Sequence, residues 1–375
     1  MTGAFLEVRD VGVCTESAGA TLSGEVSGER LFWCMPPRAT IALRGEPFVA
    51  ALLVSAMRSR RDLVLPINAP VDAEFLANIA TLQVIFARWF PDLQRVEVHA
   101  PTIAPRRPVS ERLAGFSGGV DSSHTVMSLA DTLDGTVLFD GIEYRNPNSS
   151  LMSKVGETLG RAMAARGLPL TTVQTNVKSI GLLTGGRWSE FIGGALASIP
   201  HALGVAEYII AGSNSWENLR PYGTHPFTDP LWSSNSTRIR HHGAEALRIE
   251  KLAALGSAPD LLGVLRVCFQ GEDYNCGVCH KCLQTAAALR ALGMTSPAMP
   301  PLTDPKLLRG MVVEHNGDLV DWIEIVTPEL KSRDPALARE LGRMIRRYRL
   351  RQLMKQLDDV AFSGRARKML DRLKP

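Results

Sequence analysis

The stretch Ser117-Gly118-Gly119-Val120-Asp121-Ser122 lies between two apolar patterns, and the three segments together indicate the architecture of the chain. Residues 112–116 (RLAGF) before it are typical of a short buried strand, and residues 124–133 (HTVMSLADTL) after it carry apolar residues at helical spacing. The two glycines allow the backbone to turn sharply between them. The sequence therefore predicts a strand, a tight loop and a helix in succession.

The alternation of strands and helices continues beyond this unit. Strands are expected at residues 135–144 (GTVLFDGIEY), 170–176 (LTTVQTN) and 207–214 (EYIIAGSN), with helical segments between them. Such alternation predicts an α/β fold with a doubly wound parallel sheet. The proline-rich segment 101–108 suits neither a helix nor a strand interior. We expect an N-terminal α+β domain over residues 1–105, the parallel-sheet domain over 110–300 and a helical extension over 301–375.

The composition is that of a globular protein, with 375 residues, 45% hydrophobic and 21% charged. No run approaches eighteen apolar residues, and the first residues lack the basic and apolar regions of a signal peptide. We therefore expect a cytoplasmic protein with no membrane partner. The sequence leaves open whether the chain forms a homodimer.

The net charge of +4 is small, but basic residues concentrate near the C-terminus. From Arg339 to Lys374 there are twelve lysines and arginines against four acidic residues, interleaved with leucine, methionine and isoleucine at helical spacing. This pattern favours an amphipathic helix that packs on the body and keeps a solvated basic face. Binding of RNA or phosphate by that face is the alternative.

The glycine loop has the composition of a phosphate-binding site. Successive backbone N–H groups at the start of a helix can cradle a pyrophosphate, and the hydroxyls of Ser117 and Ser122 add donors. The carboxylate of Asp121 would repel phosphate unless a cation intervenes, so it implies Mg²⁺ or a helix-capping role. The alternative is a Gly-Ser loop that only caps the next helix. No GK[ST] follows, which excludes a Walker loop.

Four of the six cysteines form one cluster in the sequence, with gaps of seven, two and two residues: Cys268, Cys276, Cys279 and Cys282. Two-residue gaps let paired sulfurs face one point, and four thiolates complete a tetrahedral Zn²⁺ shell. Because a closed shell leaves no position for a substrate, we expect a structural zinc. An Fe–S cluster on the same ligands and a metal-free thiol cluster are the alternatives.

The glycine loop resembles that of the N-type ATP pyrophosphatases, which include NAD synthetase, GMP synthetase, tRNA thiolases and 7-cyano-7-deazaguanine synthase. The resemblance covers roughly residues 110–295 and implies an adenine nucleotide alpha hydrolase-like fold that cleaves ATP between its α- and β-phosphates. Gly212-Ser213-Asn214 looks like the family's G-x-N, which lines the nucleotide site. Arg248-Ile249-Glu250 resembles the Lys-x-Glu helix start, whose cation contacts the phosphates.

The order of these motifs and the cysteine spacing are similar to 7-cyano-7-deazaguanine synthase, which converts a carboxylate to an amide and then a nitrile. Two substrate-facing segments depart from that pattern. Asp140-Gly141-Ile142-Glu143 replaces a Tyr-Gly-Gln stretch, and residues 215–230 (SWENLRPYGTHPFTDP) replace a Tyr-Pro-Asp-Cys-Arg segment. We therefore expect another, larger acceptor, which is a small molecule, a protein or an RNA.

The resemblance implies an ATP-dependent ligase that adenylates a carboxylate or carbonyl-type acceptor and replaces AMP with a nitrogen nucleophile. It assigns catalysis to Asp121, Ser122 and Arg248. Nucleotide and Mg²⁺ binding fall to Ser117, Gly118, Gly119, Asp121, Ser122, Asp140, Gly212 and Asn214. Two alternatives remain: a sulfur transferase of the tRNA-thiolase type, which needs a persulfide-bearing cysteine or an Fe–S cluster, and a non-catalytic ATP-binding sensor or scaffold.

The segment from Trp216 to His242 is dense in polar and aromatic residues, and a loop of this length in a compact domain is usually functional or disordered. We predict a lid or acceptor-binding wall in which Arg238 and Arg240 face anionic groups. A surface loop without a special role is the alternative.

Overall fold

A computed structural model describes residues 5–17, 19–36, 41, 43–105, 109–142, 149–270, 273–313 and 316–362. Glu143 and the basic residues Arg365, Arg367, Lys368, Arg372 and Lys374, which the sequence analysis considered, lie outside the described residues.

A ten-stranded, mostly parallel sheet runs through the molecule in the order β12-β11-β8-β9-β10-β3-β2-β1-β4-β6. Five neighbouring strands in its first half all pair in parallel. They are β8 (Val109–Gly115), β9 (Gly135–Asp140), β10 (Leu170–Thr175), β11 (Val205–Ala211) and β12 (Arg238–His242). The expected α/β fold with a parallel sheet is therefore confirmed.

The N-terminal strands continue this sheet. β1 (Phe5–Glu16), β2 (Gly19–Val26) and β3 (Glu29–Met35) form an antiparallel meander, and β3 pairs with β10 through Gln174↔Cys34 and Thr175↔Trp33. β4 (Asp62–Val64) and β6 (Val98–His99) extend the far edge, while β5 (Val71–Asp72) and β7 (Thr102–Ile103) form a separate pair. One sheet thus spans the boundary expected near residue 105.

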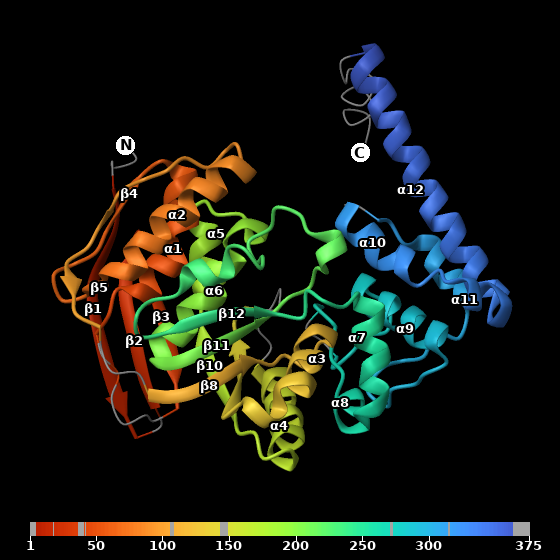
Figure 1. Ribbon diagram of the computed structural model, residues 1–375, viewed down its shortest axis with the longest axis horizontal. Helices are drawn as coiled ribbons and strands as arrows, with labels where there is room; N and C mark the ends of the chain where they lie inside the picture. Colours follow the sequence, from red (N-terminus) through yellow and green to blue (C-terminus); the bar gives the residue numbers. More distant parts are fainter. Residues whose placement is uncertain are drawn as a thin grey trace.

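Helices cover both faces of the sheet, because alternate residues of each strand point in opposite directions. Leu113, Val137 and Tyr208 enter one hydrophobic core, with α1 (Glu46–Ser59), α2 (Ala73–Trp89), α5 (Val177–Leu183) and α6 (Trp188–Leu203). Ala114, Leu138 and Ile209 enter the other core. Its helices are α3 (Val120–Leu129), α4 (Ser149–Ala165), α7 (Arg248–Ala254), α8 (Pro259–Gly263) and α9 (His280–Leu292), as Figure 1 shows.

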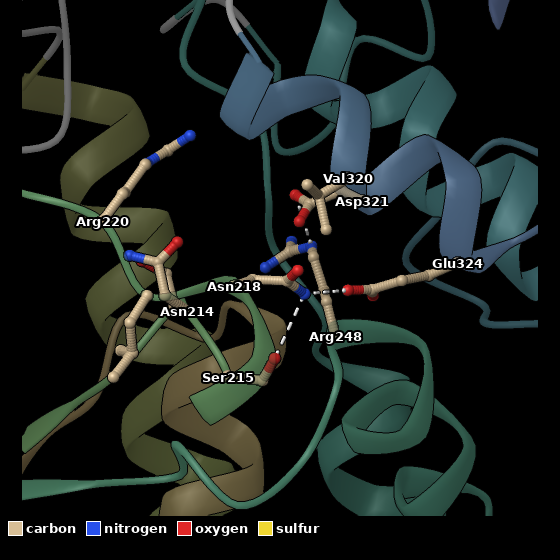
Figure 2. Close-up of a pocket in the computed structure, with 10 residues that line it drawn as sticks. Asn214, Ser215, Asn218, Arg220, Arg248, Val320, Asp321 and Glu324 are labelled. Carbon is tan, nitrogen blue, oxygen red and sulfur yellow. Dashed lines mark hydrogen bonds and ion pairs between the residues drawn. The ribbon is translucent and has the colours of Figure 1, made fainter.

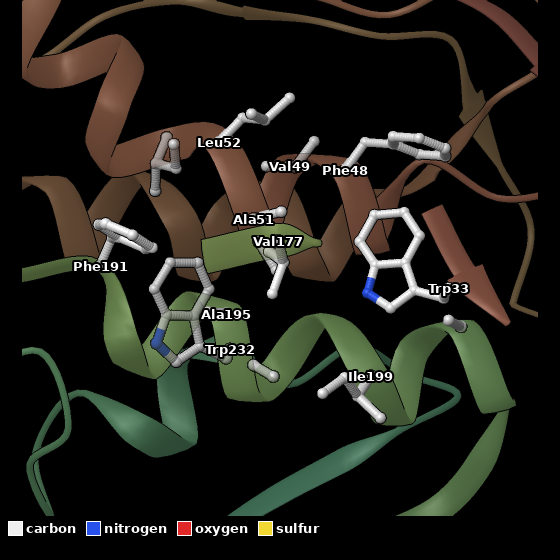
Figure 3. Packing of buried hydrophobic residues seen from close by; sticks show 14 of the residues in the cluster. Trp33, Phe48, Val49, Ala51, Leu52, Val177, Phe191, Ala195, Ile199 and Trp232 are labelled. Carbon is white, nitrogen blue, oxygen red and sulfur yellow. The ribbon is translucent and has the colours of Figure 1, made fainter. Parts of the chain in front are cut away.

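The first core contains a close helix-to-helix contact between α1 and α6, seen in Figure 3. A Cβ atom added to Gly194 of α6 would lie 2.1 Å from the carbonyl oxygen of Ala50 and 2.9 Å from the ring of Trp232. Trp33 closes the same region, since its Nε1 donates to Ser198 Oγ at 3.0 Å and its ring packs edge-on against Phe48. Glycine is therefore required for α1 and α6 to approach this closely.

The C-terminal residues form α10 (Asn316–Glu324), α11 (Pro328–Arg333) and α12 (Pro335–Phe362). The first half of α12 packs into the second core through Leu337, Leu341 and Tyr348. The apolar side chains of Leu350, Leu353, Met354 and Leu357 are exposed, and Figure 1 shows α12 projecting away from the body. The expected docked amphipathic helix is thus found over the first half of α12. None of the helices in the described ranges has the length and apolar character needed to cross a bilayer.

Replacing Gly194 with alanine should lower the free energy of unfolding by about 1–3 kcal/mol, because the new methyl group collides with the backbone of α1. Gly160→Ala is the matched control, since it also lies inside a helix but an added Cβ meets nothing within 4 Å. Better helix propensity should raise the stability of this control by up to about 1 kcal/mol. Urea unfolding measures both, and equal changes would contradict the proposed contact.

Candidate functional site

The order in which the chain adds strands to the sheet reverses between β8 and β11. From β8 the chain proceeds through β9 to β10, then returns to place β11 on the other side of β8. The connecting helices change face as well, because α3 and α4 lie in one core and α5 and α6 in the other. Ligands of open α/β sheets bind at such a switch point, outside the carboxyl ends of the strands. The two motifs Ser117–Ser122 and Gly212–Asn214 follow the two strands that flank it.

The glycine loop has the expected tight turn. Gly118 has φ +75°, and its carbonyl accepts a hydrogen bond from Arg266 N at 2.8 Å. A Cβ atom at Gly118 would lie 2.9 Å from the side chain of Leu159. Helix α3 starts after Gly119 with no side-chain cap, so its first backbone N–H groups keep their capacity to bind an anion. The hydroxyls of Ser117 and Ser122 lie 3.3 Å apart beside this turn.

Asp121 lies between two cations from α7. Its Oδ2 accepts from Arg248 Nη1 at 2.7 Å, and its Oδ1 lies 3.2 Å from Lys251 Nζ. Burial alone would raise the pKa of Asp121, but the charges of Arg248 and Lys251 outweigh burial and lower the pKa to about 2. The carboxylate is therefore charged throughout the physiological range. Its contacts make it an anchor for two cations and not a cap of α3.

Lys251 is the residue of this cluster that the sequence analysis missed. Its side chain is 1% exposed, and its Nζ also donates to the carbonyl of Gly212 at 2.6 Å, which joins α7, α3 and the end of β11. The spacing from Arg248 to Lys251 could have revealed it, because helix residues three apart share a face. Glu250 of the expected Lys-x-Glu pattern instead accepts from Leu247 N at 2.8 Å, at the start of α7.

A cavity of about 180 Å³ lies beside Arg248 and is lined by Asn214 and by residues of α10 (Figure 2). Asp321 of α10 lies 3.9 Å from Arg248 Nε, and Glu324 accepts from Asn218 Nδ2 at 3.0 Å. Burial, with the nearby charge of Asp321, raises the pKa of Glu324 to about 7. The sequence analysis assigned no site residue to this helix, so its two carboxylates are an unexpected part of the site.

Asp140, Arg238 and Arg240 lie outside the Asp121 cluster, whereas the start of the predicted lid lines the cavity through Asn218, Leu219 and Arg220. Asp140 ends β9, one strand from β8, where burial raises its pKa, and it does not join the ion pairs of Asp121. The expectation for Arg238 and Arg240 was wrong in its local structure, since both belong to the edge strand β12. Arg240 pairs with Glu207 of β11 at 3.1 Å and Arg238 is exposed. The pattern RIRHH hid this strand because it contains a single apolar residue.

The four clustered cysteines converge as their spacing predicts. Their sulfur atoms all lie within 4.8 Å of one another, and the pairs Cys276–Cys282 and Cys268–Cys279 are each separated by 4.0 Å. Tetrahedral thiolates around Zn²⁺, each at about 2.3 Å, would lie roughly 3.8 Å apart. The cluster could therefore bind a metal such as zinc, at the N-terminus of α9.

This cluster and the glycine loop share one segment of chain. Two residues before Cys268, Arg266 N holds the carbonyl of Gly118, as described above. The side chain of Asn275 fastens the same segment from the other side, because it accepts from Val267 N at 3.0 Å and donates to the carbonyl of Leu265 at 2.9 Å. A metal bound to the cysteines would thus stabilise the backbone around Arg266, which holds the glycine loop by a hydrogen bond.

No protein-family model, curated protein or solved structure matches this chain. The resemblance to the N-type ATP pyrophosphatases therefore rests on the motifs and their order, and the activity that it implies is a proposal.

The raised pKa of Glu324 makes the free energy of unfolding depend on pH. Its pKa in the folded protein, about 7, exceeds its ordinary value of 4.5, so folding favours the protonated form. The stabilisation is complete below pH 4.5 and is lost as the pH rises toward 7. In urea unfolding measured from pH 4.5 to 7, the free energy of unfolding of Glu324→Gln should not show this decline. Glu217→Gln, an exposed control, should show the same decline as the wild type. Parallel curves for the wild type and Glu324→Gln would contradict the burial of this carboxyl.

Removal of two metal ligands should destabilise the protein. The double variant Cys276→Ser/Cys279→Ser should lose bound metal in elemental analysis and at least about 4 kcal/mol of unfolding free energy, because metal-binding energy is folding energy at structural sites. Cys14→Ser, an exposed thiol on β1, is the control and should change neither quantity. Full stability with no bound metal in the wild type would show that the thiols need no ion.

Proposed function

We propose that this chain binds ATP at the switch point between β8 and β11, as an adenine nucleotide alpha hydrolase-like domain, and adenylates a carboxylate or carbonyl-type acceptor. The observation that carries the proposal is the arrangement around Asp121. The uncapped start of α3 lies beside a carboxylate that holds Arg248 and Lys251 in place. Anion-binding N–H groups and two cations at a switch point suit a triphosphate. The motifs resemble those of the N-type ATP pyrophosphatases in the same order.

Phosphate binding would redistribute the contacts of Asp121. Phosphate oxygens near the first turn of α3 would compete with Asp121 for Arg248, whose guanidinium matches phosphate geometry. Asp121 would then have an oxygen free for Mg²⁺, which proteins usually hold through one or two carboxylates together with substrate phosphates. The donor set at this position fits such an ion, which would supply charge neutralisation. Lys251 would stay on Gly212 and keep the two flanking loops together.

Nucleotide binding requires the cavity beside Arg248 to widen. The cavity of about 180 Å³ is smaller than the roughly 300–1,000 Å³ of most small-molecule sites. Its outer wall is α10, which is held by the hydrogen bond from Asn218 to Glu324 and by the distant pairing of Asp321 with Arg248. These contacts lie on the pocket side of α10, whereas on its other side Trp322 is fully buried in the second core and donates from Nε1 to His280 Nε2 at 3.1 Å. We therefore include in the proposal an outward rearrangement of the pocket-facing side chains Asn218, Asp321 and Glu324, while Trp322 keeps α10 anchored.

The reaction has two steps. An acceptor oxygen attacks the α-phosphorus of ATP, and the bond from that phosphorus to the β-phosphate bridging oxygen breaks to release pyrophosphate. A nitrogen nucleophile then attacks the activated carbon, and AMP departs with the oxygen. The loop N–H groups, Ser117, Ser122 and Arg248 would stabilise charge on the phosphates, so positioning and electrostatics supply the rate. The acceptor is a small molecule, a protein or an RNA.

A sulfur transferase remains the alternative enzyme. Cys14 and Cys34 lie on β1 and β3, and the other four thiols form one cluster, so no further cysteine is left to carry a persulfide beside the loop. Such an enzyme would have to use the cluster itself as an Fe–S centre. Zinc in the purified protein supports the ligase, and iron with labile sulfide supports sulfur transfer. A sensor that binds ATP without turnover would release no AMP.

The proposal predicts ATP-dependent release of AMP and pyrophosphate when an acceptor is supplied from a panel of carboxylates, proteins and RNA. Asp121→Asn should reduce AMP formation at least about 100-fold, because it removes the anchor of both cations. Asp131→Asn is the control, since this exposed residue lies just beyond α3 and should leave turnover unchanged.

The same variants separate binding from chemistry. ATP with Mg²⁺ should raise the melting temperature of the wild type and of Asp131→Asn, and Arg248→Ala should lose this shift while its far-UV spectrum stays that of the wild type. Absence of any ATP-dependent shift in the wild type would refute the nucleotide site. A shift without AMP formation across the whole panel would favour the sensor.

A further inference from the structure

Two histidines and a glutamate that the proposed ATP chemistry does not use come together beside α3. His124 lies in α3, His242 ends β12, and Glu245 follows in the next turn. One donor atom from each lies within 4.8 Å of the other two. The imidazole rings stack at a centroid distance of 6.0 Å, although His124 and His242 lie 118 positions apart in the sequence.

The burial of His124 needs an explanation. Its side chain is 8% exposed, and within the described part of the chain its Nδ1 has no hydrogen-bond partner. A buried ring nitrogen without a partner costs free energy, because it has lost its hydrogen bond to water. Such nitrogens in folded proteins are usually satisfied by protein groups, water or an ion. The ring of His242 and the carboxylate of Glu245 lie on the same side of α3.

Thr125 orients the second histidine. Its hydroxyl, fully buried in α3, lies 3.1 Å from His242 Nδ1. When that nitrogen donates to the hydroxyl, Nε2 carries the lone pair and faces Glu245 Oε1 at 3.9 Å. Metal-binding histidines are commonly fixed in this way, by a hydrogen bond from the other ring nitrogen.

The distance between His242 and Glu245 also suits an intervening ion. A separation of 3.9 Å is too long for a hydrogen bond, but two bonds of about 2.0–2.2 Å to a shared ion can span it. The side chain of Glu245 is 57% exposed and that of His242 is 20% exposed, which provides an entry path from solvent. An ordinary ion pair between these two residues would leave the buried nitrogen of His124 unexplained.

We propose that His124, His242 and Glu245 bind a divalent transition metal of the Zn²⁺ class, at a second site separate from the four cysteines. Two imidazoles and one carboxylate form a ligand set that suits zinc and its neighbours in the first transition row. Three protein ligands leave a fourth position open to water or a ligand. Lys251 and Arg240 place positive charge near the two imidazoles, and the carboxylate of Asp121 partly offsets that of Lys251. Asp121 and His124 lie three residues apart on α3, so the ion would lie one helical turn from the Asp121 cluster.

Cobalt is the probe that separates the two metal sites. Co²⁺ bound to thiolates gives strong charge-transfer absorption, whereas Co²⁺ bound to nitrogen and oxygen does not. Metal-free wild-type protein should take up two Co²⁺ ions per chain, one with the thiolate absorption and one without it. Glu245→Gln should abolish the second uptake and leave the thiolate absorption unchanged. The side chain of Glu245 is exposed, so the substitution should leave the fold intact.

Thr125→Val tests the positioning of His242. It should weaken the second site about 10–100-fold without removing it, because the ligands remain but the ring is no longer held. His99→Ala, a half-exposed histidine near the carboxylates of Asp62 and Glu97, is the control and should bind both ions normally. Uptake by the wild type of only the ion with thiolate absorption, or undiminished uptake of the ion without it by Glu245→Gln, would overturn the proposal. No ATP enters these measurements, so their outcome is independent of the proposed ligase activity.

Discussion

The ion pairs of Asp121 are the interaction on which the arrangement of the site depends. One buried lysine and one arginine from α7 meet a carboxylate of α3, and the lysine also holds the carbonyl that follows β11. Removing one member of a buried charge pair leaves the other uncompensated, which is strongly destabilising. The two loops at the switch point are therefore positioned by charge as much as by the sheet beneath them.

Much of the fold could be predicted from the sequence, because the alternating strands and helices of residues 110–210 carry clear periodicities. The cysteine cluster could also be predicted, because the short sequence gaps between the cysteines bring their sulfur atoms together locally. β12 was missed because an edge strand with polar residues on both sides lacks an apolar pattern. The carboxylates of Asp321 and Glu324 were missed for another reason: they reach Arg248 only through the packing of distant helices, which no local pattern records.

The site also shows how a structural element can serve a loop that it does not touch directly. The cysteines lie beside the segment 264–268, and that segment supports Gly118 through one backbone hydrogen bond. A glycine at φ +75° has many other conformations available when it is unfolded or loosely held. Fixing the backbone of Arg266 therefore restricts Gly118 to the conformation that leaves the first N–H groups of α3 accessible.

The continuous sheet has a consequence for dividing the chain. β3 covers one side of β10, so a fragment that begins after the proline-rich segment would leave the backbone N–H and C=O groups of β10 unpaired. Bare strand edges recruit other chains and promote aggregation. The N-terminal strands thus cover the edge of the parallel strands. A recombinant fragment without them should aggregate more readily in solution than the intact chain.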